Sequence, residues 1–380
     1  MNDQLNSELI EIASLSSFGF RIATQNGQRI EGNTMILEKD NFPSVSIVVL
    51  NYNGKQHLEA CLNSLSKLNY PINLYDVVLA DNKSTDDSLM FVTQNYPWVK
   101  ILPFDKNYGY AGGNNLAAKS VQGEYVAFLN PDTRVDKNWL IELIIAAMKH
   151  RDEGVVAYGG MIKFFDDASS IQVAGSKMCL HGGGYNIGYG SKDDHQFDNI
   201  TYTLSPPGCA MLVKKDIFLQ LGGFDSDYFM YIEEWDFGYR LWLAGFKNLY
   251  IPTSIVYHKM GDGFKLKIKP LLVYNEEKNR LITIVKDFEW PNVLKGLIIS
   301  FFYAAFRELS YFKNSEFELL NSILKGQIDF LRELPRTLQK RKMIQSNRKL
   351  RDKDVTRLGL MATLTDCLQE LKRTQQFRDM

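Results

Sequence analysis

The sequence has 380 residues, of which 45% are hydrophobic, and it carries 44 basic and 44 acidic side chains. A chain of this length and hydrophobic content can bury an ordinary globular core, which excludes a disordered protein. Its balanced charge gives no reason to expect a nucleic-acid partner.

Residues 1–43 are polar and weakly patterned, and they show neither the basic nor the apolar region of a signal peptide. They predict a leader or a short appended element. The cysteines are widely spaced and form no C-x-x-C pair, which favours a reducing compartment and a cytoplasmic protein; they are Cys61, Cys179, Cys209 and Cys367.

From residue 44 the chain alternates short apolar runs with segments of helical length. The pattern predicts helices over 55–67, 84–96 and 112–122, the second with Ser84 as its N-cap. It predicts strands over 44–53, 75–82, 98–104 and 124–130. Such alternation indicates an α/β fold with a Rossmann-like, mostly parallel sheet that is covered on both faces.

Polar residues stand at the carboxyl end of each predicted strand. Ligands bind beyond this edge in open α/β sheets, so we expect these residues to converge on one crevice. They are Asn51 and Asn53, Asp81, Asn107 with Gly109 and Gly112, and Asn130 with Asp132.

Asp132 follows Asn130-Pro131 at the tip of the fourth strand, where Pro131 ends the strand's hydrogen bonding. A carboxylate at this place can bind Mg or Mn and so help to neutralise a diphosphate, or it can cap the helix that begins near Lys137. Asp81 can accept a base N–H group of a nucleotide, or form an Asx turn.

The segment 107–115 places three glycines around a helix start, which suits either an anion close to the backbone or a tight loop. Further along, Glu233, Glu234 and Asp236 fall within one helical turn among aromatic residues. Such surroundings raise the proton affinity of a carboxylate and suit a general base, although a solvated acidic helix face is the alternative. His258 ends a predicted strand and is either a metal ligand or a structural histidine.

Between residues 150 and 265 the chain is less regular, with a strand predicted over 208–215, a helix over 234–245 and a strand over 249–261. Beyond Pro270 it looks helical. The apolar stretch 296–306 is too short to span a bilayer, so it lies in a membrane interface or packs as a buried helix. Residues 331–380 carry 13 basic and 6 acidic side chains, which are either attracted to anionic headgroups or simply solvated.

Several segments, taken in order, resemble the family 2 glycosyltransferases of the GT-A fold, in particular their rhamnosyltransferase-like branch. The likeness covers about residues 44–262. The segments are SIVVLNYNG, LADNKSTDDS, KNYGYAGGNN, GEYVAFLNPDT, GCAMLVKKDIF, GGFDSDYFMYIEEWDFGYRLWLAG and VYHKMG.

The resemblance implies roles for individual residues. Asp81 would contact the nucleotide base, and Asp132 would coordinate a divalent cation, Mg or Mn, with His258 as a further ligand. Glu234 falls on the family's catalytic base. Because the family usually has aspartate at that position, Glu233 and Asp236 remain alternatives for the same role.

The resemblance therefore implies an inverting glycosyltransferase. It would move rhamnose or a hexose from a dTDP- or UDP-sugar to a hydroxyl of a lipid-linked or cell-surface glycan. A non-catalytic subunit that binds nucleotide-sugars or glycans is the alternative. A dinucleotide-dependent oxidoreductase is disfavoured because the first strand ends in Asn51-Tyr52-Asn53-Gly54 and not in a glycine fingerprint.

We expect three parts in the chain: the leader over 1–43, the GT-A domain over 44–268, and a helical region over 269–380 that associates with a membrane or a partner. The expected location is the cytoplasm, with a peripheral contact at the inner face of the membrane.

Overall fold

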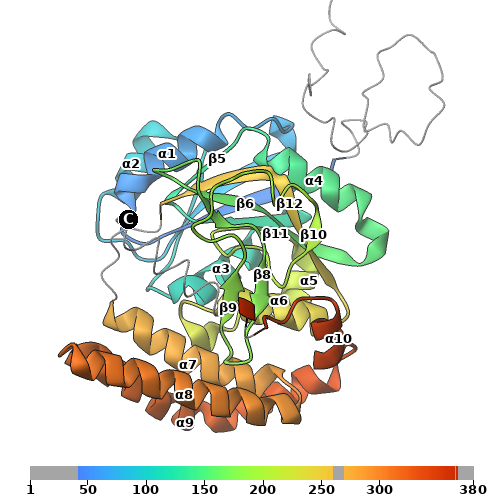
Figure 1. The fold of residues 1–380 in the computed structure, drawn as a ribbon. Coiled ribbons are helices and arrows are strands. Elements are labelled where there is room, and N and C mark those ends of the chain that lie inside the picture. The colour runs from blue at the N-terminus through green and yellow to red at the C-terminus, as the bar shows by residue number, and fades with distance from the viewer. Residues whose placement is uncertain (1–41, 260–268, 364, 367–380) are drawn as a thin grey trace, which may run out of the picture.

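The computed structural model describes residues 42–259, 269–363, 365 and 366. A ten-stranded mixed sheet lies at its centre, with helices on both faces and a layer of long helices along one side (Figure 1). The N-terminal leader predicted for 1–43 falls almost wholly outside the described residues.

Four parallel strands form one half of the sheet, in the spatial order β4-β1-β2-β3. They confirm the four predicted strands: β1 (Val45–Asn51), β2 (Tyr75–Asp81), β3 (Lys100–Pro103) and β4 (Tyr125–Leu129). The connecting helices are α1 (Lys55–Leu65), α2 (Ser88–Asn95) and α3 (Gly109–Ser120). The predicted cap was wrong, because α2 begins at Ser88 after Asp87 and Ser84 lies in the preceding loop.

The other half of the sheet is mixed. β11 (Ala210–Lys214) runs antiparallel between β4 and β6 (Val155–Phe164), and β12 (Lys247–His258) pairs in parallel with β6. The short strands β5 (Thr133–Val135), β7 (Ile171–Val173) and β10 (Thr201–Tyr202) extend this half, and β8 (Ser176–Met178) forms a separate hairpin with β9 (Gly184–Asn186). Because β11 is inserted here, residues 208 and 209 lie beside the tip of β4.

The central strands are buried on both faces, which explains why their sequences are unbroken apolar runs. In β1, Val45, Ile47 and Val49 face a core formed with α1 and α4 (Trp139–Lys149), whereas Val48 and Leu50 face a second core. The second core is closed by α3, α5 (Lys215–Gln220) and α6 (Glu233–Leu243). Three single-turn 3₁₀ helices complete the connections: Ile72–Leu74, Arg151–Glu153 and Ser226–Tyr228.

Most of the described chain between residues 270 and 357 is helical, as predicted. It contains α7 (Pro270–Asp287), α8 (Trp290–Lys313), α9 (Phe317–Ser346) and α10 (Asp352–Arg357), and the first three run side by side below the sheet (Figure 1). Pro270 and Pro291 lie in the first turns of their helices, where a missing N–H group costs nothing.

These helices share a core with the sheet domain. Tyr239 and Trp242 of α6 pack in one apolar cluster with Leu281 and Ile284 of α7. The helical region is thus built onto the domain that carries the site. Within the described residues, none of the helices has the length together with the apolar character required to cross a bilayer.

Candidate active site

The tips of β1 and β2 are joined through Asp81. Its side chain is buried; one carboxylate oxygen accepts a hydrogen bond from the Asn51 side-chain amide at 3.1 Å and the other from the Ser84 backbone N–H at 2.9 Å. Asn51 is also buried, and its Oδ1 atom has no hydrogen-bond partner among the described residues. A buried acceptor without a partner is costly, so this oxygen suits a donor group supplied by a ligand.

Asn82 fixes the start of α3. Its amide donates to the Gly109 carbonyl at 2.9 Å and accepts from the Tyr108 N–H at 3.1 Å. Gly109 has a φ of 70°, and a Cβ atom there would lie 2.3 Å from the Phe229 carbonyl oxygen. Glycine is therefore required here by the close approach of the segment that precedes α6.

Two of the predicted donor-binding residues also stabilise loops at the strand tips. The Asn53 side chain accepts from the backbone N–H groups of Thr85 and Asp86, and Asn107 accepts from the N–H of Gly109. Gly112 lies inside the first turns of α3. The side-chain oxygens of Asn53 and Asn107 are thus used within the protein.

The tip of β4 carries Asn130 and Asp132. The Asn130 N–H donates to the Cys209 carbonyl at 2.9 Å, which ties this tip to the segment ahead of β11. Asp132 lies 3.3 Å from Nε2 of His258, the last residue of β12, and Gln172 lies 2.7 Å from the other ring nitrogen. The two predicted metal ligands are thus adjacent.

Two opposing effects act on the pKa of His258. Burial disfavours its charged form, but Cys209 and the Asp132 carboxylate outweigh burial and raise the pKa of His258 to about 10. Because the Gln172 oxygen accepts from Nδ1–H, the Nε2 atom faces Asp132.

A divalent cation such as Mg or Mn would have to displace the Nε2 proton of His258, and the Asp132 carboxylate and the neutral imidazole would then be its ligands. In the part of the chain that the structure describes, no group of three or more His, Cys, Asp or Glu side chains is placed to hold a metal. A cation between Asp132 and His258 would therefore take further ligands from water or from phosphate oxygens, as Mg usually does.

The segment before α6 has a strained backbone. Phe229, Tyr231 and Ile232 all have positive φ angles, between 61° and 75°, which is unfavourable for residues other than glycine. The Asn279 side chain of α7 donates to the carbonyls of Tyr228, Met230 and Tyr231 and so holds this segment in place. Backbone strain of this kind is concentrated at functional sites, and here it sets the direction in which α6 begins.

Glu233 and Glu234 open α6. Burial raises the pKa of Glu234 to about 7. Burial and the neighbouring Glu234 carboxylate raise the pKa of Glu233 well above its usual range. Glu233 is almost fully buried, whereas Glu234 is partly exposed. Of the two, Glu234 can change its protonation state near neutral pH.

Asp236 lies in different surroundings from the two glutamates. Its side chain is fully buried between Arg240, at 2.9 Å, and Lys286, at 2.5 Å, and it accepts from the Tyr228 hydroxyl. Burial raises the pKa of Asp236, but the two cations outweigh it and lower the pKa. Of the three carboxylates predicted as candidates for the base, Asp236 is the one held in buried ion pairs.

Residues 208 and 209 connect the two halves of the site. A Cβ atom on Gly208 would lie 3.3 Å from the carboxyl carbon of Glu234, while the next residue, Cys209, interacts with His258. Tyr110 of α3 donates to the Gly208 carbonyl. The structure thus brings Glu234, His258 and Asp132 to one region at the edge of the sheet.

The sequence reasoning missed several residues of this region: Asn82, Ser84, Gln172 and Cys209, together with Tyr110 and Gly208. Asn82 follows Asp81 directly and Ser84 lies three residues after it, and Tyr110 belongs to the segment 107–115, so proximity in sequence was a usable signal for these three. Gly208 and Cys209 are placed by the pairing of β11 with β4, and Gln172 by the pairing of β7 with β6.

Comparison with known proteins agrees with this geometry. A family model described as "Glycosyl transferase family 2" matches residues 46–218. The chain is 31% identical over 236 residues to an N-acetylglucosaminyl-diphospho-decaprenol L-rhamnosyltransferase of Mycobacterium tuberculosis, with 56% of this chain and 75% of that protein covered. It is 26% identical over 231 residues to Rhamnosyltransferase WbbL of Escherichia coli K12, with 56% and 83% covered.

A solved structure of Staphylococcus aureus TarS residues 1–349 in complex with UDP-GlcNAc is similar in fold. The TM-score is 0.51 at 18% sequence identity, and 80% of this chain and 87% of that chain are covered. The chain belongs to family 2 of the glycosyltransferases, with a GT-A fold and a helical C-terminal region. It is a glycosyltransferase, as the sequence predicted.

Proposed function

We propose that this glycosyltransferase moves rhamnose or a hexose, with inversion, from a dTDP- or UDP-sugar to a hydroxyl group of a lipid-linked glycan. The name of the mycobacterial relative describes rhamnosyl transfer to a sugar carried on diphospho-decaprenol. This supports the proposed donor and acceptor classes. A cell-surface glycan is the broader acceptor class.

The nucleotide end of the donor is assigned to the tips of β1 and β2. Asp81 and the unpartnered Asn51 oxygen lie buried there and can accept N–H groups of a pyrimidine base. Each Asp81 oxygen uses one lone pair within the protein and keeps another for a ligand.

The catalytic base is assigned to Glu234. Its pKa of about 7 leaves much of it as carboxylate at neutral pH, and it retains enough basicity to take a proton. In the transfer step the acceptor oxygen forms a bond to the anomeric carbon and the bond from that carbon to the diphosphate breaks. The acceptor proton passes to Glu234, and no covalent intermediate on the protein is required.

The diphosphate is assigned to the side of Asp132 and His258. A Mg or Mn ion held by these residues would supply positive charge to the departing nucleoside diphosphate. The same side chains would also restrict the position of the phosphates, since Asp132 lies in the turn between β4 and β5 and His258 ends β12.

One observation carries the proposal. A Cβ atom on Gly208 would lie 3.3 Å from the carboxyl carbon of Glu234, and Cys209 interacts with His258, so the residue with base-like properties and the predicted cation ligands lie near the same dipeptide. A donor bound at β1 and β2 would then direct its anomeric carbon between them.

Single substitutions of the three carboxylates test the base. Glu234→Gln should lower turnover by about 10²–10⁴-fold, the usual contribution of a general base, while the donor still raises the melting temperature. The donor is found by measuring which of dTDP-rhamnose and the UDP-hexoses stabilises the wild-type protein.

Glu233→Gln and Asp236→Asn serve as matched controls. If Glu233→Gln abolishes turnover and Glu234→Gln does not, the base has been misassigned. A wild-type protein that binds a donor but transfers nothing to any polyprenyl-linked acceptor would be a binding subunit instead.

A further inference from the structure

Helix α8 is apolar on two opposite sides. Its inner side is buried and includes Val293, Gly296 and Ala304. Its outer side exposes large apolar residues at 42–73% of their surface; these are Leu294, Ile298, Ile299, Phe301, Phe302, Phe306, Leu309 and Phe312. At 100° per residue they fall within one broad arc of the helix. Packing against the rest of the protein accounts for the apolar residues on the inner side of α8. It does not account for the exposed apolar residues on the outer side.

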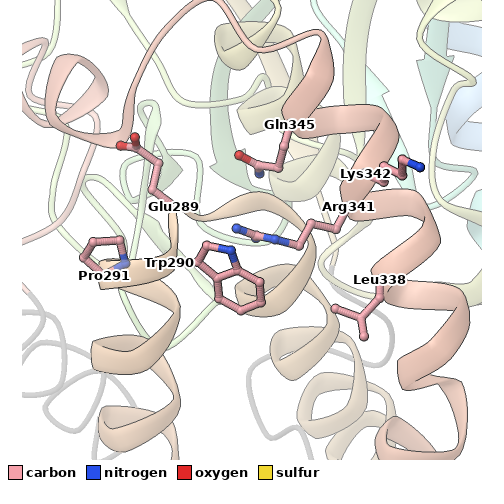
Figure 2. Close-up of a pocket in the computed structure, with 7 residues that line it drawn as sticks. All are labelled: Glu289, Trp290, Pro291, Leu338, Arg341, Lys342 and Gln345. Carbon is pink, nitrogen blue, oxygen red and sulfur yellow. The ribbon is translucent and has the colours of Figure 1, made fainter.

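Helix α9 continues this surface. It exposes Phe317, Leu324, Ile328, Leu331 and Leu338. The two helices meet at both ends of the surface: the rings of Phe312 and Phe317 have centroids 6.2 Å apart, and Trp290 and Leu338 line one pocket (Figure 2). These outward residues of α8 and α9 form what we call the α8–α9 face.

The charges around this face are mostly positive. Between residues 290 and 346 the exposed acidic residues are Glu316 and Glu318, and the exposed basic residues are Lys295, Lys313, Lys325, Arg332, Arg336 and Lys342. Between Leu294 and Phe312 the single exposed charge in this described helix is Lys295. A partner for the α8–α9 face must therefore be apolar at its centre and anionic at its edge.

The pocket at one end of the face has the same chemistry. It has a volume of about 560 Å³, and Figure 2 shows Trp290 of α8 facing Arg341 of α9, with Leu338 and Lys342 beside them. The Arg341 guanidinium lies 4.1 Å from the centroid of the Trp290 ring. Arg341 is itself buried and Glu289 also lines the pocket, so the exposed Trp290 and Lys342 are the groups suited to the level of lipid headgroups.

We propose that the α8–α9 face docks on an anionic lipid bilayer, with α8 lying in the plane of the interface. A helix of 24 residues is about 36 Å long and can lie along the surface with its arc of phenylalanines in the acyl region. A second copy of the chain fits less well, because a two-fold contact through this face would place the basic rim against itself.

The proposal rests on the proposed lipid-linked acceptor, and the structure relates the α8–α9 face to the base. A Cβ atom on Gly184 would lie 2.0 Å from the ring of Trp235, the residue after Glu234. Three residues earlier, His181 stacks on Tyr303 of α8 with ring centroids 5.0 Å apart. The segment 181–184 thus links the neighbourhood of Glu234 to α8.

Vesicle sedimentation of the full chain tests the proposal. The wild type should sediment with phosphatidylcholine vesicles that contain about 30 mol% phosphatidylglycerol and less with pure phosphatidylcholine. Phe301→Ser combined with Phe302→Ser and Phe306→Ser should lower the partition coefficient at least about tenfold. Lys295→Gln with Lys313→Gln should lower it about fivefold per lysine, and for the anionic vesicles only.

The matched control is Ile72→Ser combined with Met90→Ser and Leu219→Ser, which removes exposed apolar residues from the sheet domain and should leave sedimentation unchanged. The proposal is overturned if the wild type does not sediment, or if both triple variants behave alike. A protein mass that doubles with concentration and is lost in the phenylalanine variant, without vesicle binding, would assign the face to a dimer.

Donor-induced thermal stabilisation, measured without vesicles, separates this inference from the proposed function. The phenylalanine variant should keep it at the wild-type level. A wild type that sediments with anionic vesicles but responds to no nucleotide-sugar would contradict the donor assignment and leave the docking surface supported.

Discussion

The side-chain amide of Asn279 donates a hydrogen bond to the backbone carbonyl of Tyr231 at 2.9 Å, two residues before α6 begins. The same amide also reaches the carbonyls of Tyr228 and Met230 at 3.0 Å. Asn279, a residue of the helical C-terminal region, thereby holds the strained segment that determines the position of Glu234. The helical region therefore helps to position the residue to which we assign the role of base.

Asn279→Ala should therefore impair catalysis more than a typical buried polar substitution. Three carbonyls lose a hydrogen bond from this amide, and the segment with positive φ angles can relax, so we expect a loss of about 2–4 kcal/mol in stability and a turnover reduced at least about tenfold. Chemical denaturation and donor turnover measure the two effects.

Asn275→Ala is the control on the same helix face. Asn275 is also buried, but its amide bonds only within α7, to the Leu271 carbonyl. Asn275→Ala should lower the free energy of unfolding by about 1 kcal/mol and leave the turnover of the folded enzyme unchanged. Equal effects of the two substitutions on turnover would contradict the positioning role of Asn279.

The raised pKa of Glu234 predicts a pH dependence of turnover. A base acts as carboxylate, so the rate should rise about tenfold per pH unit below pH 7 and level off above it, because the pKa of Glu234 is about 7. The inflection should vanish in Glu234→Gln. A flat profile between pH 5 and pH 8 in the wild type would count against the assignment.

The same shift affects stability with a defined sign. The folded pKa of Glu234 is raised above the ordinary glutamate value, so the carboxylate is penalised in the fold, and the penalty grows as pH rises toward 7. Glu234→Gln should thus be more stable than the wild type at about pH 8, by up to about 3 kcal/mol, and equal to it near pH 4. Thermal unfolding at the two pH values measures the difference.

Sequence patterns predicted the parallel strands and the residues at their tips because these strands are buried on both faces and end abruptly in polar residues. They could not separate Asp236 from Glu234. Both follow the same aromatic segment, and the difference lies in Arg240 and Lys286, which surround one carboxylate only. Lys286 comes from a helix 50 residues further along, and no local pattern marks that contact.

The contacts of the basic side chains in the C-terminal region also could not be predicted from the sequence. Its cations were expected to be solvated or attracted to lipid. In the structure, Lys340 pairs with Asp225 and Asp227, and Arg341 donates to the carbonyls of Val285 and Phe288. Part of the excess positive charge therefore stabilises the contact between α9 and its neighbours, and the outward-facing residues alone remain for a surface.

Lys286 joins the helical region to the sheet domain through a buried ionic cluster. Its ammonium group lies 2.6 Å from Asp225 and 2.5 Å from Asp236, and its side chain is 1% exposed. Burial opposes the charge on each member; Lys286 and Lys340 nevertheless lower the pKa of Asp225. Lys286→Met should destabilise the protein by about 3–5 kcal/mol, because buried carboxylates lose their cation.

Lys55→Met breaks an ion pair of similar length, the 3.0 Å contact with Asp87, whose two side chains are 43% and 63% exposed. This control substitution should lower the free energy of unfolding by at most about 1 kcal/mol, since water and salt screen exposed ion pairs. Denaturant midpoints of both variants give the comparison. Similar losses would mean that the Lys286 cluster is not the connection between the two parts of the chain.

The last prediction concerns the cation. If Asp132 and His258 hold Mg or Mn together with the diphosphate, a donor should raise the melting temperature more with the metal than after chelation by EDTA. Asp132→Asn should remove that difference, because an amide is a weaker ligand than a carboxylate, and it should also lower turnover. Glu233→Gln should keep the metal dependence, since Glu233 is not one of the assigned cation ligands. A donor shift that EDTA leaves unchanged, together with full turnover, would show that the Asp132–His258 pair acts on the phosphates by hydrogen bonding from the imidazolium, whose raised pKa keeps it protonated.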